Sequence, residues 1–371
     1  MHPLVEKLRA FPHRANGSEY QQAVVSMLKE SLESIGTTAQ IRDFKAPKSY
    51  SVIVGWGVLG LAILLVLAPV FRYIDLVFLL IWVVSIYNFI NSKAALFTKL
   101  PPLVSVQNII GHHGKIVSKA KIILLAHYDT ATVGFTKAKH MRFWLIVFLV
   151  LMGLAVATAI NEVLFPNQDY LFWIKHVLIL YFLIQAVVVS VGSSGMKEKN
   201  QDAIGLVAAF ETFKYLKNSN LENIEVEIVF TGASQVGAVG AYFYSESNRA
   251  QMVNQPTFLI NFDDIGVGNL KIVTQTGIVE NYVYDNLLTN TAKQLVTSDV
   301  RFKNVAVGLV NTLNSETVWF HQIGIPCLTL TNTGQIELDS SSANSHVETS
   351  ARQATELALE TLRLSLLSLK I

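Results

Sequence analysis

The sequence predicts an α/β domain, in which a mixed, mostly parallel sheet is covered by helices on both faces, plus four transmembrane helices in two hairpins. Short apolar runs alternate with helical patterns, which is typical of layered α/β domains. The 371 residues are 51% hydrophobic but only 15% charged, whereas soluble domains are about 25% charged. This depletion argues against an ordinary soluble protein, and the net charge of +2 argues against a nucleic-acid partner.

The missing charge is concentrated in residues 49–93 and 143–194. Together these segments hold six charged side chains, namely Arg72, Asp75, Lys93, Glu162, Asp169 and Lys175. A helix needs about 20 predominantly apolar residues to cross the hydrocarbon core of a bilayer. The expected spans are Tyr50–Phe71, Leu76–Ile90, Phe143–Ile160 and His176–Gly192. The short turn at residues 72–75 and the polar loop around residue 167 make each pair a hairpin.

Two hairpins place the remaining segments on the same side of the membrane. Basic residues flank the spans on that side, at Lys45, Lys48, Lys93, Lys99, Lys137, Lys139, Arg142, Lys197 and Lys199. By the positive-inside rule, we expect a multi-pass protein of the cell membrane with a cytoplasmic soluble domain. The single cysteine, Cys327, cannot form an internal disulfide and agrees with a reducing compartment.

The hairpins interrupt the α/β domain twice. We expect residues 1–48, 94–142 and 195–371 to build that domain, and residues 49–93 and 143–194 to form the two hairpins. This division predicts that the lipid bilayer is one partner of the chain. It also predicts that the α/β domain lies close to the membrane.

Four apolar runs are predicted to be strands of the α/β domain, at Lys121–Ala126, Ile224–Phe230, Thr257–Phe262 and Ile325–Thr331. Continuous apolar strands indicate a sheet covered on both faces. Apolar residues recur with helical spacing in Ala203–Lys217 and in Thr349–Leu369. Ser18 with Gln21 resembles a capping box that opens another helix.

Polar residues follow three of these strands directly. They are His127 to Asp129, Thr231 to Gln235, and Asp263 with Asp264. Ligands bind at the carboxyl ends of strands in open α/β sheets. A His-x-Asp pair by itself is weak evidence, because a histidine at a strand end is more often a structural group than a metal ligand.

Taken in order, these segments resemble the M28 family of zinc aminopeptidases, in which a cocatalytic metal pair sits at the strand ends of one α/β domain. The matching pieces are Arg14 with Gly17 and Ser18, His127 to Thr130, Asn200 to Gly205, Ala233 to Gly240, Asn261 to Asp263, Gly324 to Pro326, and His346. The resemblance covers most of the chain outside the hairpins. It implies the zinc-aminopeptidase fold for the α/β domain.

The resemblance also implies roles for individual residues. His127 and Asp263 match ligands of one metal, and His346 matches a ligand of the other. Asp129 matches the acid that orients the first histidine. The metal-bridging aspartate aligns with Gln201, and the catalytic and metal-binding glutamates align with Ser234 and Gln235. Choosing Asp202 as the bridge would misplace the following glycine.

This pattern lacks the carboxylates that a metal pair needs. Two divalent ions about 3.5 to 4 Å apart repel, and anionic ligands between them hold them together. Among the positions aligned with the metal ligands and the general base, only Asp263 is a carboxylate, so we expect no cofactor. The alternative is a single zinc ion on His127, Asp263 and His346, since three protein ligands and water form a recognised zinc site.

Other motifs are weaker. Glu316 and its neighbours lack the surroundings of a nucleophile elbow, and the glycines at 232, 237 and 240 lack the lysine of a phosphate-binding loop. Cys327 is expected to be an inert core thiol. His112 and His113 precede Gly114, which favours a solvated turn over a metal site.

Two functions are compatible with these residues. The preferred hypothesis is a pseudo-peptidase that acts as a binding, scaffolding or regulatory subunit of a membrane complex, with a membrane-protein partner or a second copy of itself. Its pocket is then either an inherited relic or a site for a peptide end or a small ligand. The alternative is a divergent membrane metallo-aminopeptidase, although Ser234 cannot act as its general base at pH 7. A transporter component is disfavoured because the expected spans hold almost no ionisable residue.

Overall fold

The computed structural model describes residues 3–114, 118–130, 141–165, 171–191, 201–219, 221, 223–266, 268–310, 315–332 and 343–369. The chain forms two compact units. The α/β unit comprises Met1–Ala46, Ser105–Ala131 and Glu198–Ile371, and the helical unit comprises Pro47–Val104 and Thr132–Lys197.

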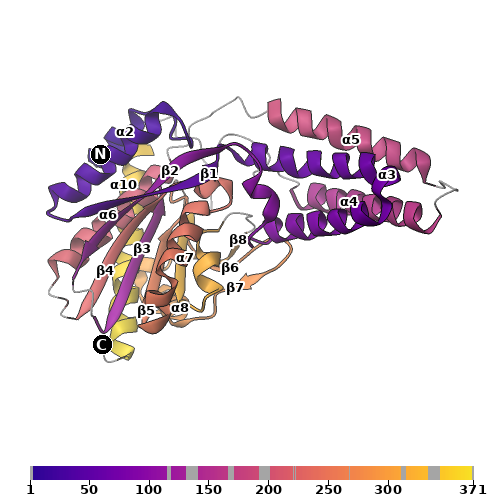
Figure 1. The fold of residues 1–371 in the computed structure, drawn as a ribbon. Coiled ribbons are helices and arrows are strands. Elements are labelled where there is room, and N and C mark those ends of the chain that lie inside the picture. The colour runs from indigo at the N-terminus through magenta and orange to yellow at the C-terminus, as the bar shows by residue number, and fades with distance from the viewer. Residues whose placement is uncertain are drawn as a thin grey trace. The chain divides into compact units, whose positions relative to one another are not determined.

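A nine-stranded sheet forms the centre of the α/β unit (Figure 1). Its strands are β1 (Ala39–Pro47), β2 (Leu103–His113), β3 (Ala120–His127), β4 (Ile224–Thr231), β5 (Thr257–Phe262), β6 (Leu270–Thr276), β7 (Tyr282–Val283), β8 (Ala306–Val310) and β9 (Cys327–Asn332). They follow the order β1-β2-β4-β3-β5-β9-β6-β7, with β8 paired to β6. The predicted mixed α/β fold is confirmed.

The four strands expected from apolar runs form the middle of this sheet. β4, β3, β5 and β9 are neighbours and pair in parallel. β2 pairs antiparallel with β4, and β6 pairs antiparallel with β9 and β7 but in parallel with β8. Every residue of β3 is buried. Ile122 and Leu124 belong to one hydrophobic core and Ile123 and Leu125 to another, because successive side chains of a strand point to opposite faces.

Helices cover both faces of the sheet. One core contains residues of α1 (Pro3–Arg9), α2 (Glu19–Ser34), α6 (Gln201–Asn218), α8 (Leu287–Ser298) and α10 (Ala343–Ser368). The other contains residues of α7 (Val239–Asn254) and α9 (Thr317–His321). The described part of the unit also contains the 3₁₀ helices η4 (Ser234–Val236) and η5 (Val300–Phe302).

The helix at Ser18 begins as expected, but its cap differs. The Ser18 side chain makes no capping hydrogen bond, and the side-chain Oε1 of Gln21 accepts from the backbone N–H of Gly17 at 2.6 Å. The backbone N–H of Ser18 donates instead to the carbonyl oxygen of Ala15. The predicted capping box is therefore wrong in both of its hydrogen bonds. Gly17 has φ 69°, a conformation that glycine adopts without strain.

Two glycines after β4 allow the chain to pack closely. A Cβ atom on Gly240 would lie 2.2 Å from the carbonyl oxygen of Gly232. Asn108 joins the same contact, accepting from the N–H of Gly232 at 3.2 Å and donating to the carbonyl oxygen of Gly240 at 2.9 Å. These glycines therefore bring α7 against the end of β4.

The helical unit contains α3 (Tyr50–Ile90), η1 (Leu96–Lys99), α4 (Met141–Leu164) and α5 (Phe172–Val191). By length and composition, α3, α4 and α5 are three candidate membrane spans. Four separate spans were expected, but the first two are joined into a single 41-residue element that contains Pro69 and one non-helical residue, Phe71. Proline has no backbone N–H to donate, so a proline in the interior of a helix bends it.

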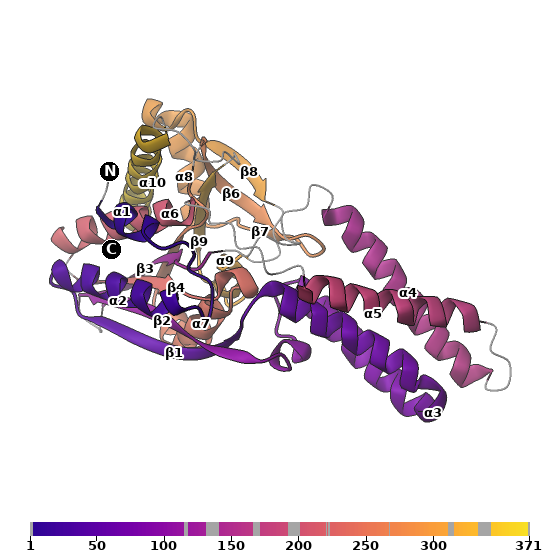
Figure 2. The same ribbon diagram turned by 90° about the horizontal axis from the view of Figure 1, so that it is seen from above.

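Contacts within α3 show that it folds back on itself. The indole N–H of Trp82 donates to the carbonyl oxygen of Gly57 at 2.8 Å, and the rings of Tyr50 and Phe89 lie 5.4 Å apart. In each pair the two residues lie almost equally far from Pro69 along the sequence, on either side of it. α3 therefore consists of two antiparallel arms, as Figure 2 also shows. The predicted turn at residues 72–75 is instead helical, and the reversal lies closer to Pro69.

Candidate functional site

The carboxyl ends of β3, β4, β5 and β9 meet at one edge of the sheet. His127, the last residue of β3, is in register with Thr231, the last residue of β4. Asp263 follows β5 directly, and its backbone N–H donates to the carbonyl oxygen of Leu330 in β9. Parallel pairing therefore brings residues that are far apart in the sequence to the same edge.

His127 lies next to two carboxylates at this edge. Its Nε2 atom is 3.6 Å from Asp263 Oδ1 and 3.8 Å from Asp264 Oδ1. The His127 side chain is 1% exposed, whereas those of Asp263 and Asp264 are 24% and 33% exposed. One ligand atom from each residue lies within 4.8 Å of the other two. This donor set fits one divalent cation reached from solvent, with three protein ligands and an open position.

The other ring nitrogen of His127 fixes its orientation. Nδ1 lies 3.1 Å from the backbone carbonyl oxygen of Asp129, which can only accept a hydrogen bond. In the neutral ring Nδ1 is therefore the donor, and the lone pair of Nε2 faces Asp263 and Asp264. The carboxylate of Asp129 is farther away, with Oδ1 at 3.5 Å from Nδ1. The backbone carbonyl of Asp129 thus orients the histidine at closer range than its acid group does.

The Asp129 carboxylate instead holds the turn after β4. Its two oxygens accept from the backbone N–H groups of Ser234 and Gln235, each at 3.1 Å. Ala233 and Ala238, which flank this turn, have φ values of 57° and 54°, which non-glycine residues rarely adopt. Two hydrogen bonds to a charged acceptor help to stabilise this strained backbone.

A fourth carboxyl group, that of Glu316, is buried beside Thr231 at the end of β4. Glu316 is 1% exposed, and the Thr231 hydroxyl donates to its Oε1 at 2.5 Å. Burial, together with the nearby charges of Asp263 and Asp129, raises the pKa of Glu316 to about 7, although His127 and Thr231 oppose this shift. This carboxyl group therefore changes its protonation near neutral pH.

Three of the expected site residues have side chains outside the described residues. Gln201 and Asp202 are the first two residues of α6, and His346 lies near the start of α10. The backbone of Gly205 packs against β5, where a Cβ atom would lie 2.6 Å from the carbonyl oxygen of Phe262. The start of α6 is therefore placed close to the strand that carries Asp263.

Residues 199–357 match the family model of peptidase family M28. The predicted resemblance to family M28 is confirmed. The M28 peptidase-like domain also resembles solved structures. A Porphyromonas gingivalis glutaminyl cyclase matches with a TM-score of 0.50 and 12% identity, over 99% of this chain and 96% of that chain.

Two aminopeptidases show weaker similarity. Legionella pneumophila LapA aminopeptidase has a TM-score of 0.49 and 10% identity, over 96% of this chain and 69% of that chain. A leucine aminopeptidase precursor from Bacteroides thetaiotaomicron has a TM-score of 0.49 and 12% identity, over 96% and 93%. A comparison with curated protein sequences finds no match.

Two acidic residues of the site received no role from the sequence. The resemblance counted Asp263 as the single ligand carboxylate, but the structure adds Glu316 beside Thr231 and Asp264 beside His127. Asp264 was noted at the same strand end as Asp263, and the direct succession of two aspartates was the signal for it. Asp264 has a φ of 47°, a conformation that aspartate tolerates better than most residues. The Glu316 position depends on the contact with β4 and had no local signal.

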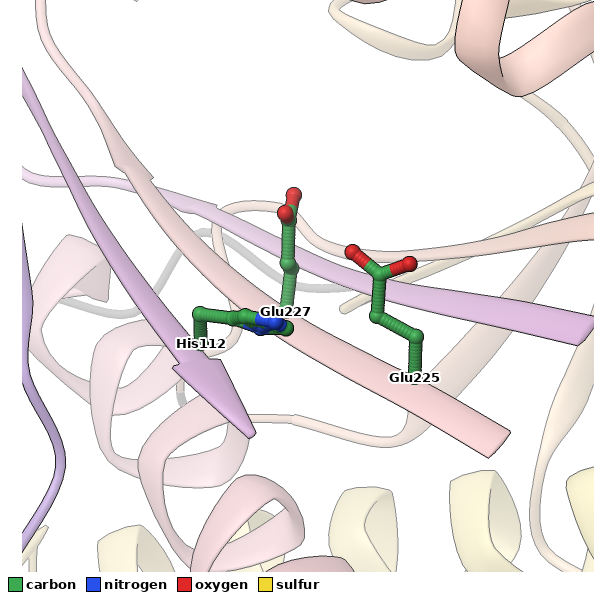
Figure 3. Close-up of side chains that lie close together, drawn as sticks. All are labelled: His112, Glu225 and Glu227. Atoms are coloured by element: carbon green, nitrogen blue, oxygen red, sulfur yellow. The ribbon is translucent and has the colours of Figure 1, made fainter. Parts of the chain in front are cut away.

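The M28 peptidase-like domain contains a second cluster of ligand-type side chains, formed by His112, Glu225 and Glu227. The predicted turn at His112 and His113 is wrong, because both residues end strand β2. Figure 3 shows the ring of His112 beside Glu227, with both glutamates extending from β4. Lys121 Nζ lies 3.1 Å from Glu225 and 2.9 Å from Glu227. This buried ammonium already supplies a cation and would repel a metal ion, so the cluster is better explained as a structural ion network.

Proposed function

We propose that this chain is a multi-pass membrane protein whose M28 peptidase-like domain binds a ligand without hydrolysing peptides. The observation that carries the proposal is the turn after β4. The M28 resemblance assigns two glutamates to the positions of Ser234 and Gln235. A serine hydroxyl and an amide cannot replace a carboxylate as general base at pH 7.

The chemistry of the edge favours a cationic ligand. His127 offers one lone pair, and Asp263 and Asp264 offer partly exposed carboxylate oxygens. Such a set suits one divalent ion or the terminal ammonium of a peptide. If zinc is the ion, His127, Asp263 and Asp264 would hold it, with His346 as the fourth candidate. A bound zinc would supply a Lewis acid, whereas the chain would supply the orientation of His127 through Asp129.

Metal analysis and peptide-cleavage assays on the purified full-length protein test this proposal. We expect zinc binding to reach no more than one ion per chain and to be lost in His127→Ala. We expect wild type to release no amino acids from a panel of peptides. Asp285→Asn, which changes an exposed aspartate of the same domain, is the matched control for Asp263→Asn. Peptide turnover that disappears in Asp263→Asn but survives in Asp285→Asn would overturn the non-catalytic function.

The second candidate is a one-metal aminopeptidase, and Glu316 is the observation that favours it. A pKa of about 7 suits a general base that works near neutral pH. If this function is correct, Glu316→Gln should abolish turnover and still bind zinc. If wild type shows no turnover, Glu316 has a structural role.

We also propose that the soluble domain is cytoplasmic and that the helical unit contacts the bilayer and a membrane partner or a second copy. Three apolar helices of sufficient length support the membrane location, and the basic flanking residues support the orientation. Protease treatment of sealed inside-out and right-side-out vesicles tests the orientation. A C-terminal tag that is cleaved only in right-side-out vesicles would refute it.

A further inference from the structure

Three ionisable side chains lie buried together in the helical unit. Asp75 belongs to the second arm of α3, Glu162 lies near the end of α4, and Lys175 near the start of α5. They are 3%, 7% and 5% exposed, respectively. Both hairpins reverse in this part of the unit, whereas the chain continues to the α/β unit from the other ends of these helices. We call these three residues the tip triad.

The tip triad contains one ion pair and one further carboxylate. Lys175 Nζ donates to Glu162 Oε1, which joins α5 to α4. The charges of Asp75 and Glu162 act on one another, so α3 contributes the third member. Among the described residues, Asp75 Oδ2, Glu162 Oε2 and the neighbouring Asn161 Nδ2 are buried without a hydrogen-bond partner.

The charges of the tip triad do not balance. Two carboxylates and one ammonium leave a net charge of −1 in a buried position. On the packed elements, the other described charged or titratable groups near this end are half-buried Arg72 and exposed Tyr73 on α3 and exposed His176 on α5. Lys99 on η1 follows the opposite end of α3. A buried charge without compensation is strongly destabilising, so one more positive charge is needed for balance.

We propose that the tip triad is a proton-binding site in which one proton is held on Asp75 or Glu162, the two buried carboxyl groups that each have an oxygen without a hydrogen-bond partner. A proton added to either carboxylate neutralises it and brings the net charge to zero. A divalent ion fits less well, because Lys175 already places an ammonium on Glu162. Proton release leaves two like charges on α3 and α4, which weakens the contact between the two hairpins.

This site was not visible in the sequence. Asp75 falls in a predicted turn and Glu162 in a predicted loop, and the expected spans hold almost no ionisable residue. The structure places both residues inside helices and buries them. Buried ionisable residues in membrane helices are usually functional. The tip triad therefore supplies buried ionisable residues of the kind whose scarcity in the expected spans disfavoured a transporter component.

Infrared difference spectroscopy of the full-length protein in lipid nanodiscs tests this site. We expect wild type to show a protonated-carboxyl band that titrates, with one proton per chain, between about pH 5 and 8. Asp75→Asn should lose the band, and Asp285→Asn should retain it. Lys175→Met removes the ammonium that favours ionised carboxylates, so its band should persist to higher pH by about one unit or more.

Two results would overturn the proton site. One is a wild-type spectrum without a titrating carboxyl band, and the other is an unchanged band in Asp75→Asn. If Asp75→Asn does not fold, an unshifted band in Lys175→Met also overturns the site. Replacing choline chloride by sodium chloride at fixed pH tests whether the site binds a proton or a sodium ion. A band that sodium abolishes in wild type would reassign the site to sodium.

Discussion

The buried lysine of β3, which pairs in register with Glu225 of β4, allows a quantitative test of the fold. Lys121 is fully buried, and its ammonium lies 3.1 Å from Glu225 and 2.9 Å from Glu227. The hydroxyl of Tyr244 also donates to Glu227. Lys121→Met keeps the length of the side chain but removes its charge. Two neighbouring carboxylates then remain without their cation.

The expected loss is large because both glutamates are shielded from water, with side chains 2% and 13% exposed. Removing one partner from a buried ion pair costs about 3–5 kcal/mol of stability. For a domain of this size, 1 kcal/mol corresponds to roughly 2–4 °C in Tm. We therefore expect Lys121→Met to lower the apparent Tm by roughly 6–20 °C.

Thermal unfolding in detergent, followed by circular dichroism, measures this shift. Lys214→Met makes the same substitution in an exposed pair with Glu211 and should leave the Tm unchanged. Neutralising both acids together with the lysine, as Lys121→Met/Glu225→Gln/Glu227→Gln, should recover most of the loss. If Lys121→Met melts within 2 °C of wild type, roughly 1 kcal/mol or less, the network does not stabilise the domain.

Three further predictions concern the site and its supports. Gly240→Ala places a methyl group 2.2 Å from a backbone oxygen and should destabilise the domain by about 1–3 kcal/mol in thermal melts, whereas Gly308→Ala, with its nearest contact at 3.6 Å, should change less. Folding raises the pKa of Glu316 from 4.5 to about 7, so the folded state holds this proton more tightly and stability should fall as pH rises from about 4.5 to 7. In thermal melts across this range, the Tm of Glu316→Gln should depend less on pH than that of wild type. The same dependence of Tm on pH in both proteins would show that Glu316 does not titrate there. Asp129→Asn retains one acceptor oxygen for two backbone N–H groups and should lower the stability of the domain by about 1–3 kcal/mol. Unchanged stability would mean that the turn after β4 is stable without these hydrogen bonds.

Much of the fold could be predicted because its signals are local. Apolar runs indicate β3, β4, β5 and β9, since a strand buried on both faces has no polar alternation. β1 was not predicted, because polar residues interrupt its sequence AQIRDFKAP and leave no continuous apolar run, and residues 40–43 are exposed. Pairing at the sheet edge, rather than local preference, makes such a segment a strand.

The sequence by itself determined the two kinds of material in the chain, the apolar helices and the α/β domain, because hydrophobicity and periodicity are properties of neighbouring residues. It also determined that Ser234 and Gln235 carry no acid. The tertiary structure decided which charges meet. Glu316 reaches the site through its contact with Thr231, and Asp75 reaches Glu162 through the packing of α3 against α4. These residues are 85 or more positions apart in the sequence, so no local pattern indicates that they lie close together. For this reason the charge depletion was visible in the sequence, but the role of the remaining buried charges was not.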